Sequence, residues 1–136
     1  MTKKCIVTLM VAVTFSFQII AQQSAVYTSK IVEYQKALTL YNNQQYQAAQ
    51  SLFKAVYKTT KETVLKSDCT YYIATCAIRL NQLNADKLVE DFVEKYPTST
   101  KRNTAFVDVA DYYFENAKYA HAQKWYNKVY ENDLSQ

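Results

Sequence analysis

The residues of this sequence that could do chemistry are few and scattered. Asp108 and Asp111 stand three positions apart, so in a helix their carboxylates would lie one turn apart, and paired carboxylates can do acid–base work. The single histidine, His121, has Lys118 and Lys124 within one turn and is predicted to be a bystander on a solvated helix face. Two acids without a pocket or a partner base do not make a catalytic centre. The sequence therefore predicts a protein that is not an enzyme and uses no cofactor.

Two cysteines, Cys69 and Cys76, lie seven positions apart in the body of the chain. On one helix their Cα atoms would be roughly 10 Å apart at 1.5 Å per residue, whereas a disulfide needs less than about 7 Å. They are predicted to be two unbonded core residues. No metal site is predicted, because the only histidine is distant in sequence.

Composition points to helices. The 136 residues contain no glycine and one proline, Pro97, which excludes glycine-rich phosphate loops and argues against β-sandwiches and nucleotide-binding α/β folds. With 49% hydrophobic and 21% charged residues the chain is globular, and an all-α domain is predicted. The net charge of +4 falls to +2 without Lys3 and Lys4, and the remaining cations are scattered, so no nucleic-acid partner is expected.

The first 21 residues predict an export signal. Lys3 and Lys4 precede an apolar run over residues 5–21, which is typical of a secretory signal peptide cleaved after Ala21, with cleavage after Ala25 as the alternative. Residues 22–29 would be a short linker. The mature protein is then expected to be periplasmic or otherwise exported, given a bacterial source, and to meet a membrane only by association. Retention of the run as an uncleaved anchor is the other interpretation.

Past residue 25 the apolar residues follow a helical period. Clusters of asparagine mark the breaks, because asparagine tolerates the left-handed conformation that ends helices, and Pro97 ends the fourth helix. The predicted helices cover residues 27–42, 46–58, 62–80, 84–95, 101–116 and 119–132. Acids and lysines of the fourth helix are predicted to form a solvated face with ion pairs one turn apart: Lys87, Glu90, Asp91, Glu94 and Lys95.

One pattern recurs in successive hairpins. The motif Tyr-x-x-Ala-x-x-x-aromatic-x-x-Val begins at Tyr46 and again at Tyr119, and a less regular version begins at Gln82. A period of about 34 to 37 residues with alanine at a fixed place indicates stacked helical hairpins, because the small side chain lets the two helices approach closely.

The segment from Ala37 to Phe53 resembles the first repeat of bacterial tetratricopeptide (TPR) proteins. The run Lys95-Tyr96-Pro97-Thr98-Ser99 is similar to the end of repeats in the TPR domains of the outer-membrane assembly lipoprotein and the Tol–Pal coordinator protein. The order of leader, repeats and a Trp125-Tyr126 helix resembles the N-terminal region of large exported multi-TPR proteins of Bacteroidota. The resemblance implies a right-handed α–α superhelix of about three hairpins over residues 30–136, with units at about 30–63, 66–99 and 103–136. The chain departs from the family in lacking glycine before the second helix of each unit, where Gln44, Leu80 and Ala117 stand.

The resemblance also implies a function and a site. TPR proteins hold a peptide or a protein in a groove lined by the first helix of each hairpin, so an exported interaction scaffold of the cell envelope is expected. Carried over by repeat position, the groove would be lined by Tyr34, Leu38, Tyr41, Asn42, Thr70, Ala74, Ala77, Thr104, Asp111, Phe114 and Glu115.

Thirteen tyrosines leave another interpretation open. Exposed aromatic rings could stack on sugars in a glycan-binding accessory protein, and a glycan-cleaving enzyme on helical repeats would need clustered acids near a cleft. Most of the tyrosines at or beside the motif are instead predicted to be packing residues: Tyr46, Tyr72, Tyr113, Tyr119 and Tyr126.

The last helix carries no sign of a polar cap. Trp125 is predicted to lie on its exposed side with Val129 or Tyr130. This suggests self-association through the last helix, docking of that end on a partner, or a longer array of which this chain is a part.

Overall fold

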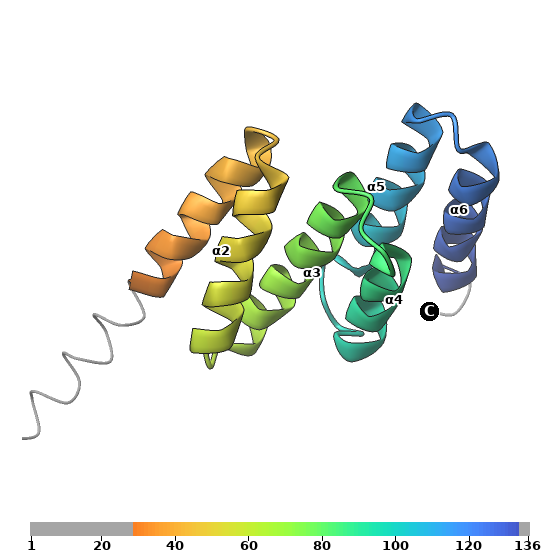
Figure 1. Ribbon diagram of the computed structural model, residues 1–136. Helices are drawn as coiled ribbons and strands as arrows, with labels where there is room; N and C mark the ends of the chain where they lie inside the picture. Colours follow the sequence, from red (N-terminus) through yellow and green to blue (C-terminus); the bar gives the residue numbers. More distant parts are fainter. Residues whose placement is uncertain (1–28, 134–136) are drawn as a thin grey trace, which may run out of the picture.

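The computed structural model describes residues 29–133, with side chains up to residue 129, and this part of the chain is helical with short connections (Figure 1). A first helix covers residues 29–42. It is followed by α2 (Tyr46–Thr59), α3 (Thr63–Arg79), α4 (Ala85–Lys95), α5 (Arg102–Glu115) and α6 (Tyr119–Asp133). The predicted all-α class is confirmed, and the predicted helix limits that fall on described residues agree to within one residue. The predicted start of the first helix at residue 27 lies outside the described residues. The proposed leader lies outside the described residues.

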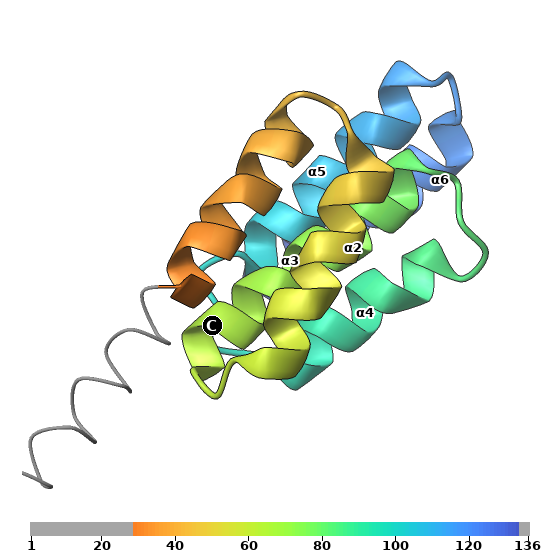
Figure 2. The same cartoon turned by 60° about the vertical axis from the view of Figure 1, so that its left-hand side comes forward.

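The helices form three antiparallel hairpins. Hairpin one joins the 29–42 helix to α2, hairpin two joins α3 to α4, and hairpin three joins α5 to α6. Figure 1 shows the three turns within hairpins along the top and the two linkers between hairpins along the bottom, and the same order can be followed in Figure 2. No helix of residues 29–133 is both long enough and apolar enough to cross a membrane.

The turns within the three hairpins share one backbone geometry. A left-handed residue occupies the same place in each: Gln44 (φ 60°), Asn81 (φ 49°) and Ala117 (φ 57°). The N–H of the next residue donates to a carbonyl five positions back, over 2.8 to 3.0 Å, as in a Schellman turn. Gln44 and Ala117 hold this conformation without being glycine, at about 1 kcal/mol each.

The middle turn corrects one prediction. The left-handed residue is Asn81, whereas Leu80, predicted to stand there, has φ −92°. The middle unit is therefore shifted by one residue, because the left-handed residues stand 37 positions apart between hairpins one and two but 36 apart between hairpins two and three. The turn of hairpin two is also longer and contains a second left-handed residue, Asn84 (φ 61°). Helix α4 consequently begins at the motif alanine, Ala85, whereas α2 and α6 begin three residues before theirs.

The core consists of two apolar clusters that share Tyr72. One lies between hairpins one and two and the other between hairpins two and three. The motif alanines Ala49, Ala85 and Ala122 are buried in or beside them, as predicted. Cys69 and Cys76 are free and fully buried on α3, also as predicted, and burial raises the pKa of each thiol to about 12.

Two predictions for the last hairpin are wrong. Trp125 is fully buried, not exposed, because α6 turns this side of the helix toward α5, where the indole lies 5.9 Å from the Phe106 ring. Tyr119, predicted to be a packing residue, is 61% exposed because it lies at the outer end of α6. The other four tyrosines of that prediction are half-buried against the clusters.

Candidate partner-binding surface

Asp108 and Asp111 do not form a carboxylate pair. The Tyr71 hydroxyl of α3 donates to the Asp108 carboxylate, and the Tyr126 hydroxyl of α6 donates to Asp111 over 2.5 Å. The two carboxylates accept hydrogen bonds from different neighbouring helices, so they do not face one position that a substrate could occupy. His121 is exposed, as predicted, with its ring 5.2 Å from that of Tyr113. Among the residues that the structure describes, no group of three or more potential ligands is placed to hold a metal ion.

Tyr34, predicted to line the groove, is buried between hairpins one and two. Its side chain is 8% exposed, and its hydroxyl donates to the Asp68 carboxylate of α3 over 3.2 Å. Burial, followed by the Asp68 charge, raises the Tyr34 pKa far above its ordinary value of 10.0. Tyr34 therefore joins two hairpins and offers almost no surface to a partner.

Tyr71 repeats this arrangement one hairpin later. It stands ten residues before Asn81, as Tyr34 stands ten residues before Gln44. Its buried hydroxyl reaches Asp108 on the first helix of hairpin three, and burial together with that bond raises its pKa. The sequence patterns did not predict this pair of tyrosine–carboxylate links. The signal was a tyrosine at the same place in two successive hairpins.

The one-residue shift also moves the predicted middle of the groove. Ala74 and Ala77 are core residues, 2% and 0% exposed, so their assignment to the groove is wrong. Thr70 is half-buried and its hydroxyl donates to the Lys66 carbonyl of its own helix. The shifted positions are occupied by residues that are buried as well: Tyr71, Thr75 and Ile78.

At the edge nearest the turns, the first helices carry an accessible row. Asn42, Arg79 and Glu115 each stand two residues before the left-handed residue of their hairpin. Asn42 and Glu115 are exposed, Arg79 is half-buried, and a loose ion pair of 3.9 Å joins Arg79 to Glu115. We call these three residues the turn-end row. Nearby, Asp111 is exposed and Phe114 is 56% exposed.

The remaining predicted groove residues lie on either side of this row. Leu38 and Tyr41 are half-buried against the first cluster, and burial raises the Tyr41 pKa. Thr104 is exposed near the start of α5. The predicted groove is thus closed at Tyr34, Ala74 and Ala77, which are buried, whereas Asn42, Asp111, Phe114 and Glu115 remain accessible toward the turn end.

Two hollows flank the linker between α4 and α5. One of about 160 Å³ is lined in part by Val64, which is 76% exposed, and by Asp68. The other lining residues all carry a hydroxyl group: Thr63, Ser67, Tyr96, Thr98, Ser99 and Thr100. The Ser67 hydroxyl donates to that of Ser99 over 3.0 Å. The other, of about 340 Å³, is lined by Glu90, Val93, Glu94, Pro97, Arg102, Phe106 and Lys128. The sequence predicts that Pro97 ends the fourth helix, but it does not predict the hollows beside this proline.

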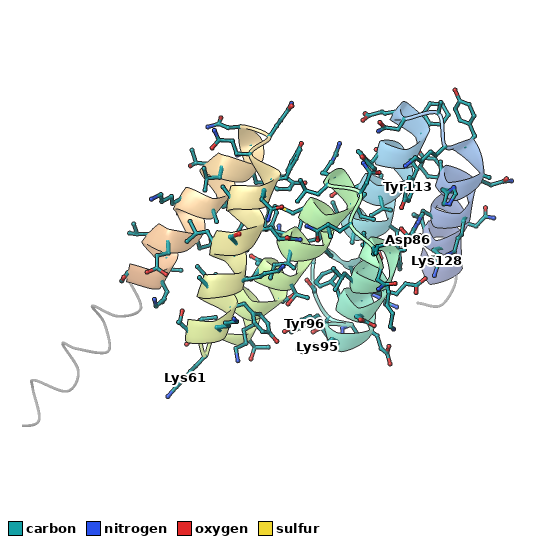
Figure 3. All side chains as sticks on the ribbon, viewed as in Figure 1. Lys61, Asp86, Lys95, Tyr96, Tyr113 and Lys128 are labelled. Carbon is teal, nitrogen blue, oxygen red and sulfur yellow. The ribbon has the colours of Figure 1, made fainter. Side chains whose placement is uncertain are left out.

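The second helices are linked on the opposite layer. Lys95 of α4 donates to the Tyr57 hydroxyl of α2 over 2.8 Å, and Lys128 of α6 donates to Glu90 of α4 over 2.9 Å. The predicted ion pair Lys87–Asp91 is present at 2.9 Å, but Glu90 and Lys95 bind across hairpins instead of along their own helix. Figure 3 shows Lys95 near the linker end of this layer.

Comparisons of the chain with protein-family models, with curated proteins and with solved structures gave no match. The site must therefore be interpreted from its own geometry: rigid helices, accessible polar side chains at equivalent places of successive hairpins, and carboxylates occupied by tyrosine hydroxyls.

Proposed function

We propose that this protein is an exported TPR-type scaffold that binds a protein or peptide partner along the first helices of its hairpins. The three equivalent turns and the buried alanine of each hairpin support a regular helical repeat. A right-handed superhelix is the arrangement that such repeats produce when each hairpin packs on the next. The apolar run of residues 5–21 after Lys3 and Lys4 supports export to the periplasm.

The turn-end row is the observation that carries this proposal. Three consecutive hairpins present hydrogen-bonding side chains at one equivalent place, on helices that the core holds rigid. A partner segment lying across the hairpins could bind Asn42, Arg79 and Glu115 in succession. The Arg79–Glu115 pair is long, at 3.9 Å, and only Arg79 is half-buried, so it contributes little to stability and a partner can replace it at little cost.

The aromatic residues do not favour glycan binding. Trp125, Tyr34, Tyr71 and Tyr112 are buried. Of the aromatic side chains that the structure describes, the two well-exposed rings, Phe114 and Tyr119, meet edge to face instead of forming a flat platform. The tyrosine content is used mainly for packing between hairpins.

The test is affinity capture from envelope extracts with the protein lacking its leader. Glu115→Lys reverses a charge in the turn-end row, and Glu94→Lys makes the same change at an exposed site on α4, in the opposite layer. We expect a partner that the unmodified protein and Glu94→Lys retain and that Glu115→Lys loses. Equal capture by both variants would mean that the partner does not bind along the turn-end row.

A further inference from the structure

Hairpins one and three carry the same residues on one face. Tyr46, Ala49 and Gln50 of α2 recur as Tyr119, Ala122 and Gln123 of α6, each 73 residues later. The aromatic, the valine and the tyrosine that follow at positions 53, 56 and 57 recur at positions 126, 129 and 130. In hairpin one this face is covered by hairpin two, so its contacts can be described in detail.

A reciprocal amide pair holds the covered face. The Gln50 side chain is 2% exposed, and its Nε2 donates to the Ile73 carbonyl over 3.1 Å and to Gln82 Oε1 over 3.0 Å. The Gln82 amide donates back to Gln50 Oε1 over 3.0 Å. A buried amide needs such partners, so this glutamine specifies how the next hairpin docks.

A group of three rings accompanies the amide pair. Tyr41 and Tyr46 of hairpin one meet edge to face, with centroids 5.4 Å apart and planes at 71°. Tyr72 of hairpin two supplies the third ring, 5.1 Å from Tyr41. Tyr72 also stacks on Phe53 at 4.8 Å with planes 9° apart.

Hairpin three has the same ring pair without the third member. Phe114 and Tyr119 meet at 5.4 Å and 66°, and no other ring contacts either of them among the described side chains. They are 56% and 61% exposed, and Gln123 is exposed where Gln50 is buried. Tyr126 is half-buried where Phe53 is fully buried.

We propose that this face of hairpin three, made of Phe114, Tyr119, Gln123 and Tyr126, is a docking site for another helical hairpin. The occupant supplies an aromatic ring at the place of Tyr72, and a carbonyl and a side-chain amide at the places of Ile73 and Gln82. It completes the ring group and buries Gln123. The site is distinct from the turn-end row and does not depend on the proposed function.

The free end of a second copy does not fit this description. Gln44 and Asn81 occupy equivalent places in their turns, so each residue of hairpin two corresponds to the residue 37 positions earlier in hairpin one. The residues that correspond to Tyr72, Ile73 and Gln82 are therefore Gln35, Lys36 and Gln45. Gln35 and Lys36 are exposed and polar, so they offer no ring to Phe114 and would bring a charge against it. The occupant is therefore a hairpin with an apolar, aromatic first helix like α3.

The test supplies such a hairpin as an appended copy. Residues 60–136 are joined after Asn132, which corresponds to Thr59, so that a copy of hairpin two follows α6 in the register in which hairpin two follows α2. We expect one cooperative unfolding transition at higher temperature than that of the original chain. Gln123→Ala should raise the unfolding constant of the extended chain roughly tenfold and leave the original chain unchanged.

Two matched variants keep the test decisive. Gln50→Ala should destabilise both chains, and Asn127→Ala, at an exposed site on α6, should destabilise neither. Separate unfolding of the appended part, or an extended chain unaffected by Gln123→Ala, would overturn the proposal. Sedimentation of the original chain completes the test. A dimer that dissociates on Tyr119→Ala would show that the occupant is a second copy, and this result would also overturn the proposal.

Discussion

The two junctions between hairpins join similar elements by different means. At the first junction a linker of three residues, 60–62, brings α3 directly against α2, and stacked rings with a buried amide pair fill the interface. At the second, the linker of residues 96–101 contains Pro97 and is flanked by two hollows. Partly buried hydrogen bonds take a larger part there: Tyr113 donates to Asp86 over 2.6 Å, and Figure 3 shows these two side chains meeting between α5 and α4.

The difference between the two junctions shows that similar hairpins can be joined by linkers of different length. A short linker leaves no room between the helices, so the contact must be filled by side chains that fit closely. A longer linker relaxes that requirement, and polar contacts at the rim then fix the orientation. We therefore expect stability to be concentrated at the first junction.

The largest expected effect comes from Tyr72, the ring shared by both clusters. Tyr72→Ala removes the stack on Phe53 and the edge contacts with Tyr34 and Tyr41, and should lower the free energy of unfolding by about 3 kcal/mol. Tyr96→Ala, which removes a half-buried ring at the start of the second linker, should cost about 1 kcal/mol. Urea unfolding measures both. Equal costs would contradict the concentration of stability at the first junction.

Alkaline pH should weaken both junctions through their buried tyrosines. Burial raises the pKa of Tyr34 and Tyr71 in the folded state, so their contribution is complete below pH 10 and is lost as the pH rises above it. The loss should be about 1.4 kcal/mol per pH unit for each tyrosine. Tyr34→Phe and Tyr71→Phe should each flatten this dependence in urea unfolding series between pH 9 and pH 11. Because each tyrosine spans one junction, the variant with the greater effect identifies the junction that alkali opens first. Flattening by neither would mean that these hydroxyls ionise without opening the fold.

The amide pair should give an intermediate effect confined to the first junction. Gln50→Ala leaves the Gln82 amide and the Ile73 carbonyl without their partner, and should cost about 1.5 kcal/mol. A double-mutant cycle of Gln50→Ala with Gln82→Ala should give a coupling energy of about 1 kcal/mol. The pair Gln50→Ala and Asn116→Ala serves as the uncoupled reference, because Asn116 binds within its own turn. Equal coupling in both cycles would show that the amide pair is not a unit.

The sequence predicted the helices well because their ends have local causes. Asn81, Asn84 and Pro97 mark breaks whatever surrounds them, and the buried alanines repeat at a fixed place. The candidate site was predicted less well. The left-handed residues of hairpins one and two stand 37 positions apart and those of hairpins two and three 36 apart, so the expected period misplaced the middle helix by one residue. Ala74 and Ala77 are buried in the second cluster, and the periodicity of one helix does not predict such contacts with other hairpins. The side that Trp125 faces depends on the rotation of α6 against α5, and periodicity alone does not fix that rotation.

The smallest expected effect concerns the ion pair that joins α6 to α4, the second helices of hairpins three and two, at the second junction. Lys128 donates to Glu90 and holds the pKa of that carboxyl below its ordinary value of 4.5. A lowered carboxyl pKa contributes stability that is present above about pH 4.5 and is lost as the pH falls through the folded-state pKa. Both side chains are partly exposed, so the contribution is a few tenths of a kcal/mol.

Glu90→Gln should remove this part of the acid dependence in unfolding curves at pH 3 to 6, and 0.5 M NaCl should reduce it in the unmodified protein, because salt screens exposed charges. Glu94→Gln on the same helix has no ion pair with Lys128 and should leave the acid dependence as it is. If Glu90→Gln changed stability as much as Gln50→Ala does, the Lys128–Glu90 ion pair would contribute as strongly as the buried amide pair. The contrast between a packed first junction and a polar second junction would then no longer hold.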